Sequence, residues 1–392
     1  MVKKVNCLED IKIFIIFTPR TLDLLFMITK NENDYCVILA GGRGRRLWPC
    51  SRIKKPKQFI DFFSTGRTLL QDTFDRVSKL IPTENIYVCT NHEYAHYVVK
   101  QLPELPPENI LSEPIHRNTA PSVAWATYRI VRKNENARML VVPSDQAVFK
   151  EDVFQENIKA GLELVSKREI ILTLGVKPTR PEPGYGYIQC GDYLEHDGIY
   201  EVKSFTEKPD REFAQMFINS GEFLWNSGMY LSNVKHMRKC LQQVFPVVLR
   251  KLEDREEINH VSLEEEIIFI EENFSTYPNI SIDEGLLEHE QPVFVMKGDF
   301  GWADLGMWHS IYENLKKGDD DNVIISSQVI LDDSKNNIIK LPKDKLGIIN
   351  GLDGYIVAEE GNVLLICKKG DSSALVRKFV NETQLQYGEE YM

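Results

Sequence analysis

The amino-acid sequence predicts an α/β fold with a Rossmann-like, mostly parallel sheet, followed by a small all-β unit. The apolar runs at residues 35–40 and 85–90 are typical of strands buried on both faces of a parallel sheet. Between them, residues 68–80 carry apolar side chains at helical spacing. A strand, helix, strand order of this kind builds a parallel sheet with right-handed crossovers.

The alternation continues along the chain and then changes character. Apolar runs at 109–112, 139–142 and 170–176 predict further strands, and the spacing at 121–131 and 154–165 predicts helices between them. After a charged linker at 316–322, short apolar runs separated by Asp, Asn and Gly extend to residue 367. This second pattern predicts a β-rich module.

Composition excludes several classes of protein. The chain has 392 residues, enough for two domains, with a formal net charge of −11 that argues against general nucleic-acid binding. Its seven cysteines are scattered, odd in number and never in a Cys-x-x-Cys spacing. That usage favours reduced thiols in a cytoplasmic protein over a disulfide framework or a zinc site.

The first thirty-odd residues form a separate segment. The apolar runs at 11–17 and 22–28 are interrupted by polar residues. Neither reaches the roughly 18–20 apolar residues that cross a bilayer, so no membrane association is predicted. We expect residues 1–33 to be an N-terminal extension, and residues 1–26 to be an appendage or the product of an upstream start site.

A glycine-rich turn follows the first strand. Gly41, Gly42 and Gly44 leave main-chain N–H groups free to approach an anion. The stretch from residue 43 to 57 contains no acid and seven cations: Arg43, Arg45, Arg46, Arg52, Lys54, Lys55 and Lys57. Such a run can be a nucleic-acid patch, a solvated face or a polyphosphate site. Its place after a buried strand favours polyphosphate, because ligands of open α/β sheets bind at that edge.

The loop lacks both the third glycine of a dinucleotide fingerprint and the Gly-Lys-Ser/Thr of a P-loop. Leu39 to Pro49, followed by Pro56-Lys57, instead resembles the signature of sugar-1-phosphate nucleotidylyltransferases, most closely the mannose-1-phosphate guanylyltransferases. The resemblance implies catalytic roles for Arg46 and Lys57, and none for Arg45. The nucleotide-binding residues that it implies in the loop are Leu39, Ala40, Gly41, Gly42 and Gly44.

Residues 113–121 contain a second motif. On their own, Asn118 and Thr119 predict a cap for the helix that begins near Pro121. The resemblance adds that Glu113, Asn118 and Thr119 bind the nucleotide. A carboxylate at Glu113 would accept from the N1 and N2 donors of guanine, which adenine does not have.

Two aspartates stand out as candidate metal ligands. Asp145 ends an apolar strand, where an isolated Asp is more often a cap or turn former. Asp304 lies in Trp302-Ala303-Asp304-Leu305-Gly306, which resembles a family motif. The resemblance implies that the two carboxylates hold Mg²⁺. Gln146 replaces the usual His of the family, and Asp283 is only a supporting residue.

The middle third resembles the sugar-binding half of the same family. Its motifs are Gly184 to Ile188, Phe205 to Pro209 and Trp225 to Tyr230. Tyr230 is predicted to be a core aromatic. The residues implied to bind the sugar phosphate are Gly175, Gly186, Glu207, Lys208 and Asn226.

Together these observations predict a catalytic domain at 34–316 and a small β-rich domain at 323–392, which the resemblance describes as β-helix-like. The implied reaction is nucleotidyl transfer from GTP to mannose 1-phosphate, with Mg²⁺, by a homo-oligomer, expected to be a dimer. The alternatives are a different sugar or base, or a non-catalytic relative that binds a sugar nucleotide. The presence of Arg46, Lys57, Asp145 and Asp304 favours the enzyme.

Overall fold

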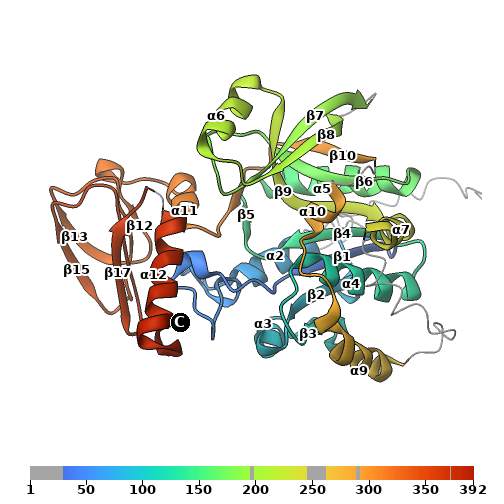
Figure 1. Ribbon diagram of the computed structural model, residues 1–392, viewed down its shortest axis with the longest axis horizontal. Helices are drawn as coiled ribbons and strands as arrows, with labels where there is room; N and C mark the ends of the chain where they lie inside the picture. Colours follow the sequence, from blue (N-terminus) through green and yellow to red (C-terminus); the bar gives the residue numbers. More distant parts are fainter. Residues whose placement is uncertain (1–29, 195–197, 245–261, 288–291, 371) are drawn as a thin grey trace, which may run out of the picture.

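The computed structural model describes residues 30–194, 198–244, 262–287, 292–370 and 372–392 (Figure 1). The apolar runs at 11–17 and 22–28, and with them the proposed N-terminal appendage, lie outside the described residues. No helix within the described ranges is both long enough and apolar enough to cross a membrane.

A nine-stranded sheet forms the centre of the molecule, with the strand order β3-β2-β1-β4-β9-β6-β10-β8-β7. Its strands are β1 (Asp34–Leu39), β2 (Ile86–Asn91), β3 (Ile110–Glu113), β4 (Arg138–Pro143), β6 (Ile171–Val176), β7 (Gly186–Leu194), β8 (Ile199–Glu207), β9 (Phe223–Asn233) and β10 (Val293–Gly298).

The sheet is mixed, so the prediction of a mostly parallel sheet is right only in part. The strands β3, β2, β1 and β4 run parallel to one another, and β10 is parallel to β6. The long strand β9 runs antiparallel between β4 and β6, β8 is antiparallel to both β10 and β7, and β7 also pairs antiparallel with β9. The chain therefore changes from crossover connections to hairpin-like ones after β6, where the Pro- and Gly-rich loop at 178–186 lies.

Helices cover both faces of the sheet and bury two large apolar clusters. The helices are α2 (Leu69–Ser78), α3 (Ala95–Gln101), α4 (Thr119–Lys133), α5 (Glu151–Lys167), α6 (Arg211–Ser220), α7 (Val234–Val244), α9 (Leu263–Asn273), α10 (Ile282–Leu287), α11 (Trp308–Asn314) and α12 (Ser372–Tyr387). Single turns occur at η1 (Arg45–Leu47), η2 (Lys57–Phe59), η3 (Thr83–Asn85), η4 (His92–Tyr94), η5 (Pro107–Asn109), η6 (Phe274–Thr276), η7 (Asp319–Asp321) and η8 (Glu389–Tyr391).

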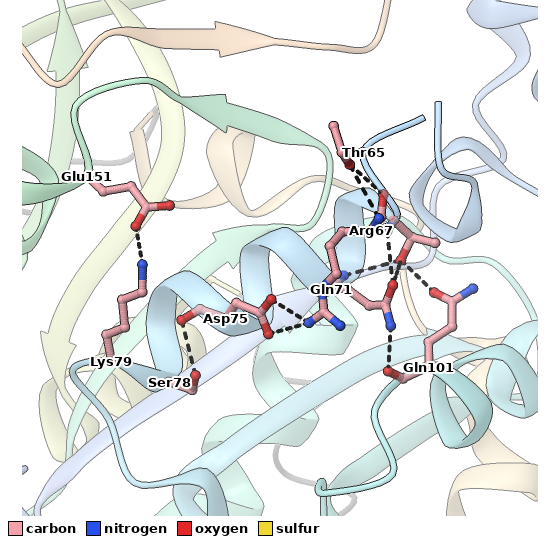
Figure 2. Close-up of polar contacts among 9 residues, drawn as sticks. Thr65, Arg67, Gln71, Asp75, Ser78, Lys79, Gln101 and Glu151 are labelled. Atoms are coloured by element: carbon pink, nitrogen blue, oxygen red, sulfur yellow. Dashed lines mark hydrogen bonds and ion pairs between the residues drawn. The ribbon is translucent and has the colours of Figure 1, made fainter. Parts of the chain in front are cut away.

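The helix α2, which follows the glycine-rich loop, is fixed at its N-terminus (Figure 2). Thr68 and Gln71 form a capping box, and the amide of Gln71 donates to the carbonyl of Gln101 on α3 at 3.0 Å. Arg67, which precedes α2, forms an ion pair with Asp75 on α2. Lys79, which follows the last residue of α2, forms an ion pair with Glu151 on α5. These contacts hold the segment after the loop against two neighbouring helices.

A short two-stranded ribbon stands outside the main sheet. It pairs β5 (Gln146–Val148) with β11 (Trp302–Asp304) in antiparallel register, with Asp304 opposite Gln146. The ribbon therefore places Asp304 beside the residue that follows Asp145.

The C-terminal part is β-rich, but the structure does not confirm that it is all-β. It contains β12 (Val323–Ile324), β13 (Gln328–Asp332), β14 (Ile338–Lys340), β15 (Leu346–Asn350), β16 (Tyr355–Glu360) and β17 (Val363–Lys368). The pairs β12–β14, β14–β16 and β13–β15 are parallel, and β17 is antiparallel to β16. The chain then forms the helix α12, because Val376 and Val380, four residues apart, are both buried on one face.

Candidate functional site

The glycine-rich loop is held open by contacts with the chain that follows it. Gly44 has a φ of 61°, and a side chain there would overlap the Ser51 hydroxyl and approach Lys57. The side-chain amide of Gln58 donates to the carbonyls of Ala40 at 2.8 Å and Gly42 at 2.9 Å. These two hydrogen bonds fix the loop backbone on one side, and the opposite side stays available to a ligand.

The seven cations of the loop have different environments. The side chains of Arg43, Arg45 and Arg46 make no hydrogen bond or ion pair within the described part of the chain. Arg52 instead donates to Asn362 at 2.8 Å and to the carbonyl of Glu360, both in the C-terminal part. Three unpaired guanidinium groups on one short turn create the positive potential that an anion site needs.

Lys57 lies close to both aspartates that the sequence singled out as candidate metal ligands. Its residue is only 4% exposed, and its ammonium group forms an ion pair with the Asp145 carboxylate. The backbone N–H of Leu305 donates to the Asp145 carbonyl at 3.2 Å, which fixes the segment of Asp304 beside it. The structure thus brings together one cation and two carboxylates that are far apart in the sequence.

Gly306 completes this cluster, although the sequence analysis assigned it no role. Its N–H donates to the Asp304 carboxylate at 2.7 Å. A Cβ atom on Gly306 would lie 2.7 Å from the Lys57 ammonium and 2.6 Å from an Asp304 oxygen. Glycine is therefore required where the two charged side chains meet. Its position two residues after Asp304 was visible in the sequence, but the crowding was not.

The carboxylates of Asp145 and Asp304 fit a divalent cation that enters with a phosphate ligand. No group of three or more His, Cys, Asp and Glu side chains that could hold a metal occurs in the described ranges. Magnesium commonly takes only one or two protein carboxylates and completes its shell with water and substrate phosphates. Two carboxylates beside a cationic loop match that requirement better than they match a zinc or calcium site.

Gln146, where the family resemblance implies a histidine, has a structural contact. Its amide donates to the carbonyl of Ser227 on β9 at 2.6 Å, while its own Oε1 is buried without a hydrogen-bond partner among the described residues. Gln146 therefore links the ribbon β5–β11 to the strand that carries Asn226.

Glu113 ends β3 and faces the glycine-rich loop. It is 2% exposed, and a Cβ atom on Gly41 would lie 3.8 Å from its carboxylate. Burial raises the pKa of Glu113 to about 8, although a hydrogen bond with Ser122 opposes the shift. Above this pKa the ionised carboxylate can accept hydrogen bonds from neutral N–H donors of a ligand.

The structure confirms that Asn118 caps α4. Its side chain accepts from the N–H of Thr119 at 3.0 Å, and its φ of 61° is unusual for a residue other than glycine. The hydroxyl of Thr119 accepts from the N–H of Ile282 at 2.8 Å. Both side chains thus have structural contacts, and their ligand-binding roles stay predictions.

The predicted sugar-binding residues form two adjoining pairs. Gly186 lies opposite Glu207 in the β7–β8 ladder, and a Cβ atom there would come within 2.8 Å of the Glu207 carboxylate. Glu207 also pairs with Lys208, whose φ is 48°. Gly175 lies opposite Asn226 in the β6–β9 ladder, but its missing side chain points toward Leu224 and Val295. Packing alone accounts for glycine at position 175.

Asp283 makes a larger contribution to the predicted sugar-binding region than the sequence indicated. Its carboxylate accepts from the amide of Asn226 at 2.6 Å and from the hydroxyl of Tyr230 at 2.7 Å. Tyr230 is fully buried, as predicted. Asp283 therefore fixes the orientation of Asn226, and its position on the short helix α10 could not be inferred from the strand pattern.

Trp48 joins the loop to the C-terminal part. Its indole N–H donates to the carbonyl of Tyr391 at 2.8 Å, and its own carbonyl accepts from the indole of Trp308 at 3.2 Å. Trp48, Trp308 and Val376 belong to one apolar cluster, which also contains Leu305 next to Asp304. The loop and the Asp304 segment therefore pack on a shared support that includes α12.

Comparisons with known proteins show which family the chain resembles. A family described as nucleotidyl transferase matches residues 35–320. The mannose-1-phosphate guanylyltransferase of Escherichia coli is 33% identical over 363 residues, which cover 91% of this chain and 76% of that protein. The enzyme of the same name from Klebsiella pneumoniae is 32% identical and is covered to 75%. A crystal structure from Thermus thermophilus, described as a mannose-1-phosphate geranyltransferase, is 30% identical with a TM-score of 0.79, and the match covers 90% of this chain and 99% of that one.

The hydrogen bond from the Trp48 indole to the Tyr391 carbonyl predicts an effect on the stability of the protein. The change Trp48→Phe removes the indole donor and some apolar contact, so the free energy of unfolding is expected to fall by about 2 kcal/mol. Urea denaturation of the purified proteins measures this difference. The change Tyr391→Phe keeps the backbone carbonyl that accepts the bond, and it should leave stability within about 0.5 kcal/mol of the wild type. Equal stability of Trp48→Phe and wild type would contradict the assignment.

Proposed function

Because the chain belongs to the nucleotidyl transferase family and is a relative of the mannose-1-phosphate guanylyltransferases, we propose that it makes GDP-mannose from GTP and mannose 1-phosphate. The observation that carries this proposal is the convergence of Lys57, Asp145 and Asp304 beside a loop with three arginines that have no partner among the described residues. This arrangement suits phosphoryl chemistry between anionic substrates.

In the proposed reaction, a phosphate oxygen of mannose 1-phosphate attacks the α-phosphorus of GTP. A new P–O bond forms, the bond to the β-phosphate oxygen breaks, and its electron pair leaves with pyrophosphate. The attacking phosphate is already ionised near neutral pH, so no strong general base is needed. At an effective dielectric constant near 20, each contact between like unit charges at about 4 Å costs roughly 4 kcal/mol. The site must therefore supply positive charge.

Lys57 is proposed to hold the α-phosphate and the incoming sugar phosphate, since it is buried at the junction of the loop and the two carboxylates. Arg46 is proposed to hold the departing phosphates from the adjacent turn. Asp145 and Asp304 would hold Mg²⁺, which neutralises phosphate charge and polarises the phosphoryl group when bound. Gly306 leaves the space in which these groups meet.

The base would lie against the loop residues from Leu39 to Gly44, with Glu113 as the residue that recognises guanine. The closeness of Glu113 to Gly41 supports this placement. Asn118 and Thr119, at the start of α4, would border the same pocket. Guanine presents two N–H donors to one carboxylate, whereas adenine presents an acceptor at N1, so Glu113 would disfavour ATP.

The sugar would occupy the side of the site formed by Gly186, Glu207 and Asn226. The carboxylate and the amide can each bond sugar hydroxyls, and Lys208 would offer a charge to the sugar's phosphate. The hydrogen bond from Asn226 to Asp283 supports this role because it fixes the amide before a ligand arrives. Gly175, opposite Asn226, would border this side through its backbone.

Further proposals concern the domains, the oligomeric state and the cellular location of the protein. Residues 34–316 would be the catalytic unit and 323–392 a smaller unit whose parallel ladders resemble turns of a β-helix. We expect a homodimer that works in the cytoplasm, where nucleotides are available.

The first test replaces Lys57. The change Lys57→Ala should lower the rate of pyrophosphate release from GTP and mannose 1-phosphate by roughly 100-fold or more, because a buried cation at the reacting phosphates is lost. The circular dichroism spectrum should not change. Lys55→Ala is a matched control, since Lys55 is exposed in the same loop. Normal turnover of the Lys57 variant would refute the proposed role.

The second test uses the raised pKa of Glu113. An acid with a pKa of about 8 is mostly protonated at pH 6.5 and must lose its proton to accept from guanine. The KM for GTP should therefore fall roughly 20-fold between pH 6.5 and 8.5. In Glu113→Gln, KM should be higher and nearly independent of pH, whereas Glu104→Gln, at an exposed position, should behave as wild type. The same pH profile in Glu113→Gln and wild type would exclude Glu113 as the titrating group.

A further inference from the structure

A cavity of about 550 Å³ lies at the carboxyl ends of β6 and β10, separate from the cluster described above. Neither Lys57 nor the carboxylates of Asp145 and Asp304 line it. The two strands are parallel neighbours, and this edge of an open sheet is where ligands commonly bind. The volume is also within the range of small-molecule sites.

Aromatic side chains form much of the wall. Tyr185 packs edge-on against both Trp225 and Trp302, with ring centroids 5.1 Å apart in each pair. Phe149, at the mouth, is 56% exposed although it is large and apolar. A planar or cyclic ligand would cover Phe149 and contact the inner rings.

The polar part of the lining is cationic. Lys177, Arg180 and Lys297 all line the cavity. One acid, Asp299, also lines the cavity, and it is paired at 2.9 Å with Lys150, which is not part of the lining. The wall therefore carries an excess of positive charge that favours an anion.

Two hydrogen-bond donors in this wall also have no acceptor. Nη2 of Arg180 and the indole nitrogen of Trp302 are buried without a partner among the described residues. Arg180 bonds Glu182 only through Nε, at 3.3 Å, and its guanidinium lies over the ring of Trp225. Buried donors are nearly always paired in proteins, and neither of these two has a partner among the described residues.

We propose that this cavity is a second ligand site, which binds a phosphorylated compound that carries a ring, such as a sugar phosphate or a nucleoside monophosphate. The phosphate is held by the cations Lys177, Arg180 and Lys297, and the ring packs against Phe149 and Trp302. This site goes beyond the proposed function, because binding here requires no transfer reaction.

The position of the cavity connects it to the candidate catalytic cluster. Trp302 lies on β11, two residues before Asp304. The hydroxyl of Tyr185 is 2.6 Å from the Ser310 hydroxyl, which donates to the Asp304 carbonyl at 2.5 Å. A ligand that moves Trp302 or Tyr185 therefore acts directly on the ribbon that places Asp304.

Equilibrium dialysis with two probes, GMP and mannose 6-phosphate, tests the proposal and distinguishes nucleotide from sugar phosphate. The test variant is Lys177→Glu with Lys297→Glu, and the control is Lys100→Glu with Lys159→Glu, where both lysines are exposed outside the cavity. For at least one probe, wild type and control should bind one more equivalent per chain than the test variant. All three proteins should keep the same kcat without added probe.

Two outcomes overturn the proposal: equal binding stoichiometry in wild type and test variant for both probes, or loss of the additional equivalent in the control as well. The second outcome would show a general effect of charge. Failure of the proposed transfer reaction is a separate result, because it is measured by pyrophosphate release in wild type and Lys57→Ala without either probe.

Discussion

The structure depends on one long-range contact, the pairing of β5 with β11. This ribbon puts Asp304 opposite Gln146 and so brings it to Asp145, while Lys57 enters between them from the loop after β1. A concentration of opposite charges at one sheet edge is costly to bury unless the charges are paired. Here the paired side chains come from three separate segments of the chain. Further backbone contacts anchor each of these segments.

The support for this charged cluster comes from the C-terminal part. Leu47, Leu305 and Val380 share one apolar cluster, so the cationic loop, the Asp304 segment and α12 are packed as a unit. The hydrogen bonds at Trp48 and the contacts of Arg52 join the same parts. The tryptophan of the loop signature thus has a packing role, and Arg52, one of the seven cations, contacts the C-terminal part.

Much of the fold could be predicted from local patterns. The first strand, the glycine turn and the cap at Asn118 depend on neighbouring residues, and Lys57, Asp145 and Asp304, which the motif resemblance selected, lie close together in the structure. Other features depend on contacts between distant segments. The antiparallel insertion of β9, the crowding at Gly306 and the bond from Asn226 to Asp283 arise only when the chain is folded, and no local period encodes them. The sequence of helix α12 does have a helical period. The run of strands that precedes it, however, favoured the prediction of further strands.

The measurement that tests the account most directly is a comparison of kcat/KM for GTP, ATP, UTP and dTTP, each with mannose 1-phosphate and with glucose 1-phosphate. The buried carboxyl at Glu113 and the sugar-side pair Glu207 and Asn226 predict that GTP with mannose 1-phosphate exceeds every other combination, by roughly 100-fold for the base, since unpaired buried polar groups discriminate strongly. Equal or higher kcat/KM for UTP with glucose 1-phosphate would contradict the account of both pockets.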